Sequence, residues 1–455
     1  MSERVLWVGD MARDDAAVER LRAVVNVVGR HQHPGLIDKA QARRGEYFAV
    51  DYENIQHLGE LAVITNSTLA VVTNDKLLAN GAVNELLLAK PDLKVVGPNK
   101  WLARLESDKE QARLWIDDID PSLNPIWRKA QTEAELRDGL DDFKSIGKEV
   151  AVKPIGPAGG RGVKVMGKNL DTYGDALNHG RDILNRQDQK KGILLEEALE
   201  GVEFNLQIMT DGRVLIRPPV TVDYSYRDDG NVGPPTGGMG SFSYAPGEIP
   251  NFMTAEDYEQ AMTFSQKLLE RAQAEYQAEF GDDQHFSGVL YPNFIMTAQG
   301  LKVIEINARP GDPEWMNIEQ VVDENVDIVD VYSRMATQDL SDNDVRFVNQ
   351  SSVAQYFVPP DYAREKGDQA VEFYLNHEAL SQHEVDLYFS SAERYTDHYR
   401  TVGSSRTYAL ATKGKDPGFA RYKIMNAHHD GGAKNLDYRR EIGHWRYIKN
   451  LKDPR

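Results

Sequence analysis

Several features that are common in other proteins are absent from this 455-residue sequence. It has no cysteine, which excludes disulfide bonds and thiolate metal sites. No apolar run approaches the roughly 20 residues that cross a bilayer, which excludes a transmembrane helix. The opening stretch, MSERVLWVGDMARDD, reaches acidic side chains before the apolar part of a secretion signal could form. We therefore expect a cytoplasmic protein with no membrane partner.

Basic residues are also in deficit. The chain has 53 lysines and arginines against 71 aspartates and glutamates, a net charge of −18. This balance disfavours a nucleic-acid partner or an anionic membrane surface. An anionic small molecule could bind only in a pocket that locally reverses the sign. With 41% hydrophobic residues, the composition is that of a globular chain, and the length favours about two to four packed units.

The first part of the chain alternates short β-branched runs with segments of helical length. We expect strands at 5–8, 24–28, 69–72 and 95–96. This pattern predicts a Rossmann-like parallel sheet over residues 1–104, covered by helices on both faces. Ligands of such sheets bind beyond the carboxyl ends of the strands. In this chain those ends are followed by residues 9–15, 74–75 and 97–98.

Residues 105–345 have a different texture, with longer helices and hairpins of α+β type. We expect strands at 149–152, 162–166, 193–196, 204–210 and 213–218, with a hairpin turn at Asp211-Gly212. A helix is expected at 255–280 and a hairpin at 288–296 and 301–306. Residues 346–455 predict a small C-terminal α+β domain with strands near 352–358 and 406–412.

A glycine-rich stretch follows a predicted strand that ends near Lys153. Glycines let backbone N–H groups approach phosphate oxygens, and cations neutralise the phosphate charge. No Gly-Lys-Ser/Thr opens a helix here, so the stretch is not a Walker loop. By itself it predicts either a phosphate-binding loop or a plain β-hairpin. The residues concerned are Lys153, Gly159, Gly160, Arg161 and Gly162.

A second stretch is an apolar strand that ends in acids. An adenine ring needs backbone donors and acceptors between apolar walls, and a ribose needs a carboxylate that accepts from its hydroxyls. Glu196, the backbone of Ala198 and Leu199, and the carboxylate of Glu203 could provide these groups. In isolation, the same residues are more typical of an acidic surface hairpin.

A third stretch pairs two oxygen ligands with a cation. Alternation along a strand places Glu305 and Asn307 on one face, together with Val303. Such a pair suits a Mg²⁺ ion that bridges nucleotide phosphates, and Mn²⁺ is a possible substitute. Arg309 could clamp a carboxylate or an acyl phosphate in fork geometry. An acid at a strand end before a Gly-Pro turn is also common.

Taken in this order, the three stretches resemble the ATP-grasp ligases, and more closely the phosphoribosylamine–glycine ligase family. GPPTGGMG at 233–240 is similar to the family's GPNTGGMG, and SGVLY at 287–291 is similar to its T-G-x-L-Y strand. EINARPGDPE at 305–314 resembles its E-x-N-x-R-x-G-D-P-E signature, and RREIG at 439–443 resembles its R-K-D-I-G. The resemblance covers essentially the whole chain.

The resemblance implies an enzyme of purine biosynthesis that activates glycine as glycyl phosphate with ATP and transfers it to 5-phosphoribosylamine. It implies small-molecule partners only, and a monomer or homodimer. It implies ATP contacts from Lys109, Lys153, Glu196, Leu199 and Glu203, and a metal site at Glu305 and Asn307. The implied catalytic residues are Arg309, Asp312 and Gly238; further substrate contacts are Arg13, Asp75, Asp223, Thr236, Gly237, Met239 and Gly311.

The departures from the family pattern concentrate where phosphoribosylamine would bind. The family's G-N-G-G-R-E-H-A is G-D-M-A-R-D-D-A at 9–16, its G-P-E-A-P-L is T-N-D-K-L-L at 73–78, and its D-H-K-R is D-Y-S-Y at 223–226. Met11 and Ala12 add a Cβ where backbone should approach a phosphate closely. Either the pocket for the same amine has diverged, or the ligase joins an amino acid to another amine. A nucleotide-binding protein without turnover is a third hypothesis.

Two further expectations concern mobility and histidines. Residues 123–195 are expected to form a lid that closes over ATP, because the site must admit and then enclose the nucleotide. His31 and His33 flank a Pro-Gly turn and are expected in a surface loop. His428, His429 and Asp430 precede two glycines, so a solvated loop is expected there and not a metal cluster.

Overall fold

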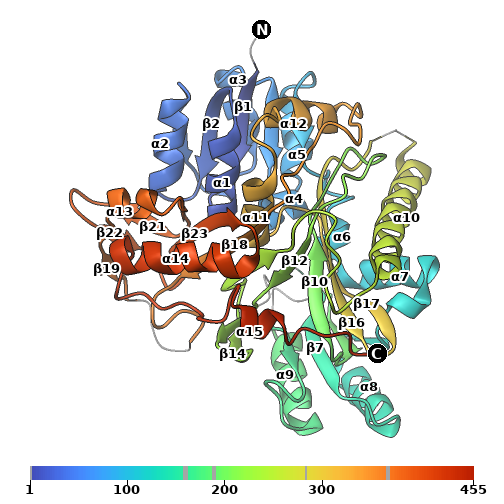
Figure 1. Cartoon of the computed structure of the whole chain (residues 1–455). Coiled ribbons are helices and arrows are strands. Elements are labelled where there is room, and N and C mark those ends of the chain that lie inside the picture. The colour runs from blue at the N-terminus through green and yellow to red at the C-terminus, as the bar shows by residue number, and fades with distance from the viewer. Residues whose placement is uncertain (1–2, 157–161, 187–190, 282–283, 365–368) are drawn as a thin grey trace.

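The computed structural model describes residues 3–156, 162–186, 191–281, 284–364 and 369–455. Its N-terminal part is a parallel sheet of order β3-β2-β1-β4-β5, which confirms the predicted Rossmann-like sheet (Figure 1). The strands are β1 (Arg4–Val8), β2 (Val24–Gly29), β3 (Tyr47–Ala49), β4 (Leu69–Val72) and β5 (Lys94–Val96). The helices are α1 (Ala12–Arg20), α2 (Pro34–Ala42), α3 (Gln56–Ile64), α4 (Asp75–Asn80) and α5 (Ala82–Ala89).

Both faces of this sheet are buried, as a parallel sheet requires. Val5 and Trp7 of β1 pack into one hydrophobic cluster, and Leu6 and Val8 pack into another on the opposite face. The first cluster also includes Trp315 and Tyr332, which lie more than 300 positions further along the chain. The N-terminal sheet is therefore packed directly against the later part of the molecule.

A separate four-stranded sheet of order β6-β9-β7-β8 lies within the segment that we expect to form the lid. Two helices pack on this sheet through Leu136 and Phe143 on one and Ala176 and Ile183 on the other. The elements are α6 (Arg104–Ser107), α7 (Lys109–Ile119), the 3₁₀ turn η1 (Pro121–Leu123), β6 (Trp127–Ala130), α8 (Glu133–Ser145), β7 (Val150–Pro154), β8 (Lys164–Val165), α9 (Tyr173–Leu184) and β9 (Ile193–Glu197).

The largest sheet has nine strands in the order β11-β16-β10-β12-β15-β18-β23-β20, with β17 paired to β16. Its last three strands come from the C-terminal segment, so that segment continues the sheet of the middle segment. The division at 104/105 and 345/346 stays a prediction. The strands are β10 (Val202–Leu206), β11 (Ile208–Thr210), β12 (Val220–Asp223), β15 (Gly240–Ser243), β16 (Gly288–Thr297), β17 (Gly300–Asn307), β18 (Ser351–Phe357), β20 (Asp386–Phe389) and β23 (Tyr408–Gly414).

Shorter strands and the remaining helices surround this sheet (Figure 1). The helix predicted at 255–280 is confirmed: Thr254 and Asp257 form a capping box at its start, and Gly281 ends it at φ +71°. The other elements are β13 (Tyr226–Asp228), β14 (Val232–Pro235), β19 (Glu372–Phe373), β21 (Ala392–Arg394), β22 (Tyr399–Thr401), α10 (Ala255–Phe280), α11 (Glu314–Val321), α12 (Ile328–Ala336), α13 (His377–Gln382), α14 (Pro417–Gly431) and α15 (Trp445–Ile448). None of the described helices combines the length and apolar character that crossing a bilayer requires.

The predicted strand at 213–218 is wrong. A single bridge pairs Thr210 with Leu215, and the chain then leaves the sheet. The Asp211 carboxylate accepts hydrogen bonds from the amides of Arg213 and Val214, at 2.9 and 2.8 Å, which holds a turn in place of a strand. Two prolines follow at 218 and 219 and supply no N–H group for a ladder.

The predicted alternation along 303–307 is also wrong in one respect. Glu305 pairs with Asn293 and Val303 pairs with Phe294, so a β-bulge at Ile304 interrupts the period of two. Val303 therefore points into the core, where it is fully buried, and does not share a face with Glu305. Glu305 and Asn307 do share a face, because their partners Asn293 and Tyr291 are two residues apart.

Candidate active site

The predicted phosphate strand and adenine strand lie side by side. Lys153 of β7 and Glu196 of β9 project from the same face of the pair, and Lys153 Nζ lies 2.6 Å from Glu196 Oε2. Both side chains are buried, Lys153 at 9% and Glu196 at 2% exposure. The Glu196 carboxylate is thus occupied by protein cations and does not reach out to a ribose.

Arg113 of α7 joins this pair to the predicted metal strand. Its Nε and Nη2 donate to the two Glu196 oxygens at 2.8 and 2.9 Å. Its Nη1 donates to the Val303 carbonyl at 2.9 Å, and its Nη2 also donates to the Ile304 carbonyl. The bulge in β17 turns these carbonyls toward the guanidinium. Sequence reasoning missed Arg113, because an arginine within a helix has no local motif that marks it.

The charges in this cluster shift one another's protonation. Burial alone would raise the pKa of Glu196, but the adjacent Arg113 and Lys153 lower it to about 2. Burial lowers the pKa of Lys109, and the carboxylate of Glu305 acts in the opposite direction. Lys109 Nζ also donates to the Gly156 carbonyl at 3.1 Å. Lys109, Lys153, Glu196 and Glu305 therefore share one location, as the sequence predicted.

The remaining predicted nucleotide contacts are placed unevenly. Gly159, Gly160 and Arg161 lie outside the described residues. Gly162 has φ +88°, and its carbonyl accepts from His179 Nε2 at 2.8 Å. The Ala198 amide donates to Glu149 O, and half-buried Leu199 follows in the loop after β9. Glu203 is the second residue of β10, and its side chain is 37% exposed and lies 3.8 Å from Lys168 Nζ.

Glu305 and Asn307 present oxygen atoms at the end of β17. Asn307 Nδ2 donates to the Tyr291 carbonyl at 3.5 Å, which orients the amide oxygen away from the sheet. Among the described residues, no group of three or more His, Cys, Asp or Glu side chains could hold a metal. A glutamate and an asparagine fit a Mg²⁺ ion whose other ligands are phosphate oxygens and water.

Arg309 follows the metal strand and is held by several groups. Its Nη2 lies 3.2 Å from Glu106 Oε1 and 3.4 Å from Asn307 Oδ1, and its Nη1 donates to the Pro310 carbonyl at 3.0 Å. Burial opposes the charge, but Glu106 and Asp75 keep the pKa of Arg309 above its usual value. The guanidinium is therefore a fixed cation at the end of β17, close to Asp75 at the start of α4.

Residues 237–240, the glycine run, are linked to Asp312 by Arg406, which sequence reasoning also missed. Arg406 Nη2 pairs with Asp312 Oδ2 at 2.9 Å, and its Nη1 donates to the carbonyls of Asp312, Gly237 and Gly238. Tyr356 Oη donates to Asp312 Oδ1 at 2.5 Å. Asp312 is 7% exposed, so in this structure it anchors the glycine run.

The other members of the run have distinct placements. Thr236 Oγ1 donates to the Ser225 carbonyl and accepts from the Gly238 amide. Gly238 has φ +101°, and a Cβ there would lie 2.7 Å from Asp223 Oδ1 and 2.5 Å from Pro313 Cδ. Met239 is fully buried in the core, so its side chain does not face a substrate.

Half-buried Asp223 and fully buried Glu314 form a carboxyl pair next to this run. Burial and the mutual proximity of the two groups raise the pKa of Asp223, and burial raises that of Glu314. Tyr291 Oη donates to Glu314 Oε1 at 2.5 Å, whereas Asp223 Oδ1 has no hydrogen-bond partner among the described residues. Gly311 packs against Glu314 and donates its amide to Gln207 Oε1 at 2.8 Å.

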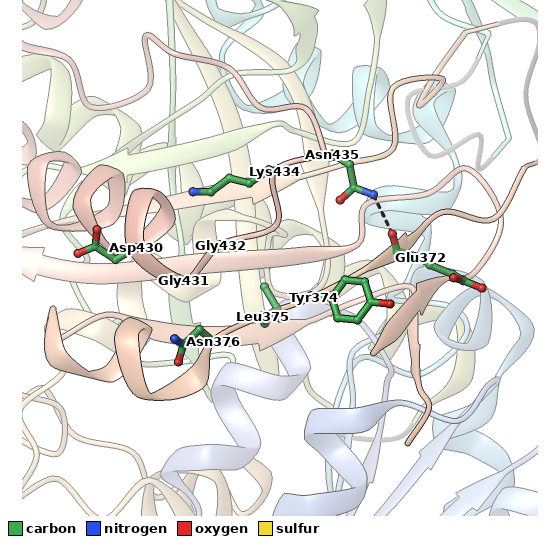
Figure 2. A pocket seen from close by; sticks show the side chains of 9 residues that line it. All are labelled: Glu372, Tyr374, Leu375, Asn376, Asp430, Gly431, Gly432, Lys434 and Asn435. Atoms are coloured by element: carbon green, nitrogen blue, oxygen red, sulfur yellow. Dashed lines mark hydrogen bonds between the residues drawn. The ribbon is translucent and has the colours of Figure 1, made fainter. Parts of the chain in front are cut away.

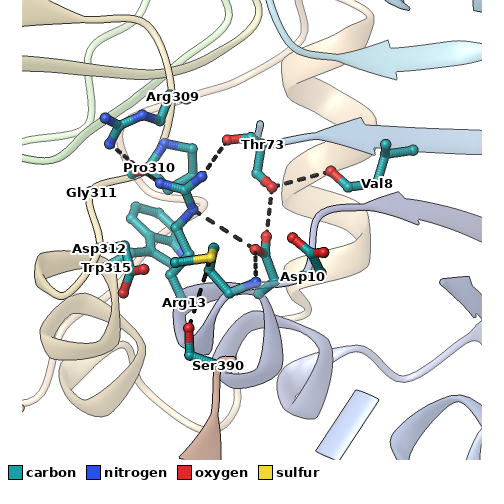
Figure 3. A network of polar contacts seen from close by, with 12 residues as sticks. Val8, Asp10, Arg13, Thr73, Arg309, Pro310, Gly311, Asp312, Trp315 and Ser390 are labelled. Atoms are coloured by element: carbon teal, nitrogen blue, oxygen red, sulfur yellow. Dashed lines mark hydrogen bonds and ion pairs between the residues drawn. The ribbon is translucent and has the colours of Figure 1, made fainter. Parts of the chain in front are cut away.

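The edge of the N-terminal sheet forms the opposite wall. Asp10 is fully buried and accepts from the Arg30 guanidinium through both oxygens, at 2.9 and 3.0 Å. Arg13 donates to the carbonyls of Thr73 and Pro310 (Figure 3). The predicted substrate residues Arg13 and Asp75 are thus brought to the same side as Arg309.

Two histidine expectations are corrected here. His33 is fully buried as the N-cap of α2, and its Nε2 donates to the Phe389 carbonyl at 3.0 Å, so it does not lie in a surface loop. His428 lies within α14, stacked 4.5 Å from Phe357, and not in a loop. The Asp-Gly-Gly signal marks the end of that helix. Sequence reasoning could not see the C-terminal strand β20 that covers His33.

A cavity of about 450 Å³ lies elsewhere, in the C-terminal segment (Figure 2). It is bordered by Tyr374, Asp430 and Asn435, with the Asn435 amide donating to the Glu372 carbonyl at 2.7 Å. The predicted site residues do not line it. The polar cluster at β7, β9 and β17 is therefore the stronger candidate for the active site.

Comparisons with known proteins identify the family of the chain. Residues 126–315 match the family described as phosphoribosylglycinamide synthetase, ATP-grasp (A) domain. The phosphoribosylamine–glycine ligase of Pyrococcus furiosus is 32% identical over 414 residues, which are 90% of this chain and 87% of that protein. Residues 126–315 contain every residue of the β7–β9–β17 cluster except Lys109 and Arg113, which lie on α7.

Two solved structures share the fold. A phosphoribosylamine–glycine ligase from Thermotoga maritima has a TM-score of 0.72 at 22% identity, with 96% of this chain and 100% of that chain covered. The biotin carboxylase domain of the Hydrogenobacter thermophilus 2-oxoglutarate carboxylase, in complex with MgADP, has a TM-score of 0.68 at 16% identity, with 96% and 92% covered. Sequence identity over nearly the full length carries the assignment further than fold: this chain belongs to the phosphoribosylamine–glycine ligase family.

Proposed function

We propose that the protein is an ATP- and Mg²⁺-dependent carboxylate–amine ligase that joins glycine to 5-phosphoribosylamine and forms glycinamide ribonucleotide. The observation that carries the proposal is the single cluster in which Arg113 ties Lys153 and Glu196 to the strand of Glu305 and Asn307. A triphosphate needs cations and a divalent ion at one place, and this cluster has residues for both. Membership of the family supports the choice of substrates.

The reaction would proceed in two displacements. A glycine carboxylate oxygen attacks the γ-phosphorus of ATP, and ADP leaves. The amine nitrogen then attacks the acyl carbon, inorganic phosphate leaves, and the nitrogen loses a proton. Catalysis of this kind is mostly positioning and charge neutralisation. Lys109 and Lys153 would neutralise the phosphates, and Arg309 would hold the acyl phosphate.

Glu305 and Asn307 would hold the divalent ion. When bound, Mg²⁺ neutralises charge on the phosphate oxygens. Mn²⁺ should support turnover as well, because it accepts the same oxygen ligands. The backbone of Ala198 and Leu199 would take the adenine, and Glu203 the ribose, since the Glu196 carboxylate is already paired. Asp223, Thr236 and Gly237 would border the amino acid.

Purified protein tests the proposal directly. ADP release should require Mg²⁺, glycine and freshly generated phosphoribosylamine together, and omission of any one should abolish it. ADP release that does not depend on phosphoribosylamine would rule out this amine as the acceptor, but the assignment as a ligase would still hold. Binding of ATP without release of ADP under any combination would favour a nucleotide-binding protein without turnover.

A second candidate keeps the ligase and changes the amine. The Asp10 carboxylate, which neutralises Arg30, is the observation in its favour, because this edge of the sheet would otherwise receive a phosphate. Met11 further crowds the edge, with its Sδ 3.8 Å from Ser390 Oγ. Rescue of a purine-auxotrophic host by this chain would count against a different amine.

A further inference from the structure

Arg13 connects two distant segments of the chain. It is the second residue of α1 and is 6% exposed. Its Nη2 donates to the Thr73 carbonyl at 2.6 Å, and its Nη1 donates to the Pro310 carbonyl at 2.8 Å (Figure 3). Thr73 follows β4 and lies two residues before Asp75, the first residue of α4, whereas Pro310 follows Arg309. One guanidinium thus joins the two walls of the site.

The Pro310 carbonyl accepts a second hydrogen bond, from Arg309 Nη1 at 3.0 Å. A carbonyl oxygen has two lone pairs and can serve both donors. Arg309 and Arg13 therefore share one acceptor, and the position of that oxygen directs the Nη1 side of Arg309, while Glu106 and Asn307 contact its Nη2. Figure 3 shows the two guanidinium groups on either side of Pro310.

We propose that Arg13 is a positioning residue that fixes the Pro310 carbonyl and, through it, directs the Arg309 guanidinium at the acyl phosphate. The proposal rests on the proposed ligase function. It differs from the expectation that Arg13 itself contacts a substrate. Both terminal nitrogens of Arg13 donate to protein carbonyls. Its buried Nε lies 3.9 Å from Asp14 Oδ2 and has no hydrogen-bond partner among the described residues, so the hydrogen bonds that the guanidinium makes go to the protein backbone.

The same helix offers a matched control. Arg20, also on α1, donates from Nη1 to the Val322 carbonyl at 3.0 Å and from Nη2 to the Asp323 carbonyl at 2.8 Å. It too joins the N-terminal domain to the later part of the chain. It lies roughly 10 Å further along the helix axis, and its acceptors lie in the last turn of α11 and just beyond it, away from Arg309. Loss of Arg20 removes an equivalent tether without touching the Pro310 carbonyl.

The experiment uses hydroxylamine as the nucleophile, so that it does not depend on the identity of the natural amine. Hydroxylamine nitrogen attacks the acyl carbon, phosphate leaves, and glycine hydroxamate accumulates with ADP. We expect Arg13→Met to lower kcat about 30-fold and to leave KM for ATP within about twofold, because the nucleotide contacts lie elsewhere. Arg20→Met should stay within about threefold of the wild type in both constants.

A double-mutant cycle shows whether Arg13 acts through Arg309. Arg309→Met alone should lower kcat about 100-fold. If Arg13 works only by directing Arg309, the double variant should be no worse than Arg309→Met, within about twofold. A double variant whose loss equals the product of the two single losses would overturn the proposal. So would an Arg20→Met loss as large as that of Arg13→Met.

If Arg13→Met does not fold, a second variant and a second measurement still test the proposal. Arg13→Lys keeps a donor that can reach one carbonyl, and the same cycle can be run with it. Amide hydrogen exchange of residues 308–314 should rise in the Arg13 variants and stay at the wild-type level in Arg20→Met; the reverse pattern would contradict the inference. Wild-type turnover with hydroxylamine but not with phosphoribosylamine would remove the proposed amine and leave this inference standing.

Discussion

The two walls of the proposed site use their charges differently. On the nucleotide wall, Lys153 and Arg113 contact one buried carboxylate, Glu196, and Lys109 lies close to Glu305. The three cations outnumber these two carboxylates. On the acceptor wall, Arg30 is matched one-to-one by Asp10, and its side chain is 49% exposed. The first wall therefore keeps a positive excess suited to a polyanion.

On the acceptor wall, the carboxylates leave no excess of positive charge. Three carboxylates, Asp10, Asp14 and Asp75, lie at or near the edge of the N-terminal sheet, and burial raises the pKa of Asp14. Arg13 is committed to two carbonyls. A phosphorylated amine would have to draw on Arg30 in competition with Asp10. The nucleotide wall follows the family pattern, and the acceptor wall has its own chemistry.

The sharpest way to break this comparison is to remove the acid at the centre of the nucleotide wall. Arg113 and Lys153 lower the pKa of Glu196 to about 2 from 4.5. A lowered pKa contributes stability above pH 4.5 that is lost as the pH falls toward 2. We expect Glu196→Gln to be less stable than the wild type by on the order of 3 kcal/mol at pH 6. Urea unfolding at several pH values should show this gap shrinking toward pH 2.

Glu319 provides a control of opposite sign. It is 3% exposed, and burial raises its pKa to about 7. A raised carboxyl pKa costs stability as the pH climbs through 7, because the unfolded chain is already ionised. Glu319→Gln should therefore match the wild type near pH 4 and exceed it at pH 8. A Glu196→Gln gap that does not vary with pH would show that the buried pair does not titrate in this way.

The next prediction concerns the divalent ion. Glu305→Ala should lower ADP release about 100-fold, because the ion that neutralises the phosphates loses its carboxylate ligand. Glu324→Ala serves as the control, since its side chain is 78% exposed and its ion pair is with Lys413, outside the cluster. The rate should be followed as a function of Mg²⁺ concentration. Unchanged phosphate release in Glu305→Ala would mean that the metal lies elsewhere.

Local patterns predicted the elements that local chemistry determines. The capping residues and the terminal glycine of the helix at 255–280 lie directly at its ends. The parallel strands are recognisable as short apolar runs. The strand at 213–218 failed because Asp211 satisfies the amides that a ladder would have used. The predicted orientation of Val303 was wrong because the sequence pattern does not indicate the β-bulge at Ile304.

The site divides in the same way. Lys153, Glu196, Glu305 and Asn307 stand in motifs, and the structure brings their strands together. Arg113 and Arg406 stand in none, yet each binds partners more than 80 positions away. The role of such residues depends on which distant segments pack against them, and composition and motif spacing do not predict that packing. The roles assigned to individual site residues stay predictions until variants are measured.

The smallest expected effect sharpens the comparison from the acceptor side. Asp10→Asn keeps the shape of the side chain and removes the charge that neutralises Arg30. If the acceptor carries a phosphate, KM for phosphoribosylamine should fall about fivefold, because a partly exposed charge pair is worth about 1 kcal/mol. KM for ATP should not change, since the nucleotide wall is untouched. A KM for phosphoribosylamine that rises instead would mean that Asp10 itself serves the acceptor, as expected of an amine without a phosphate.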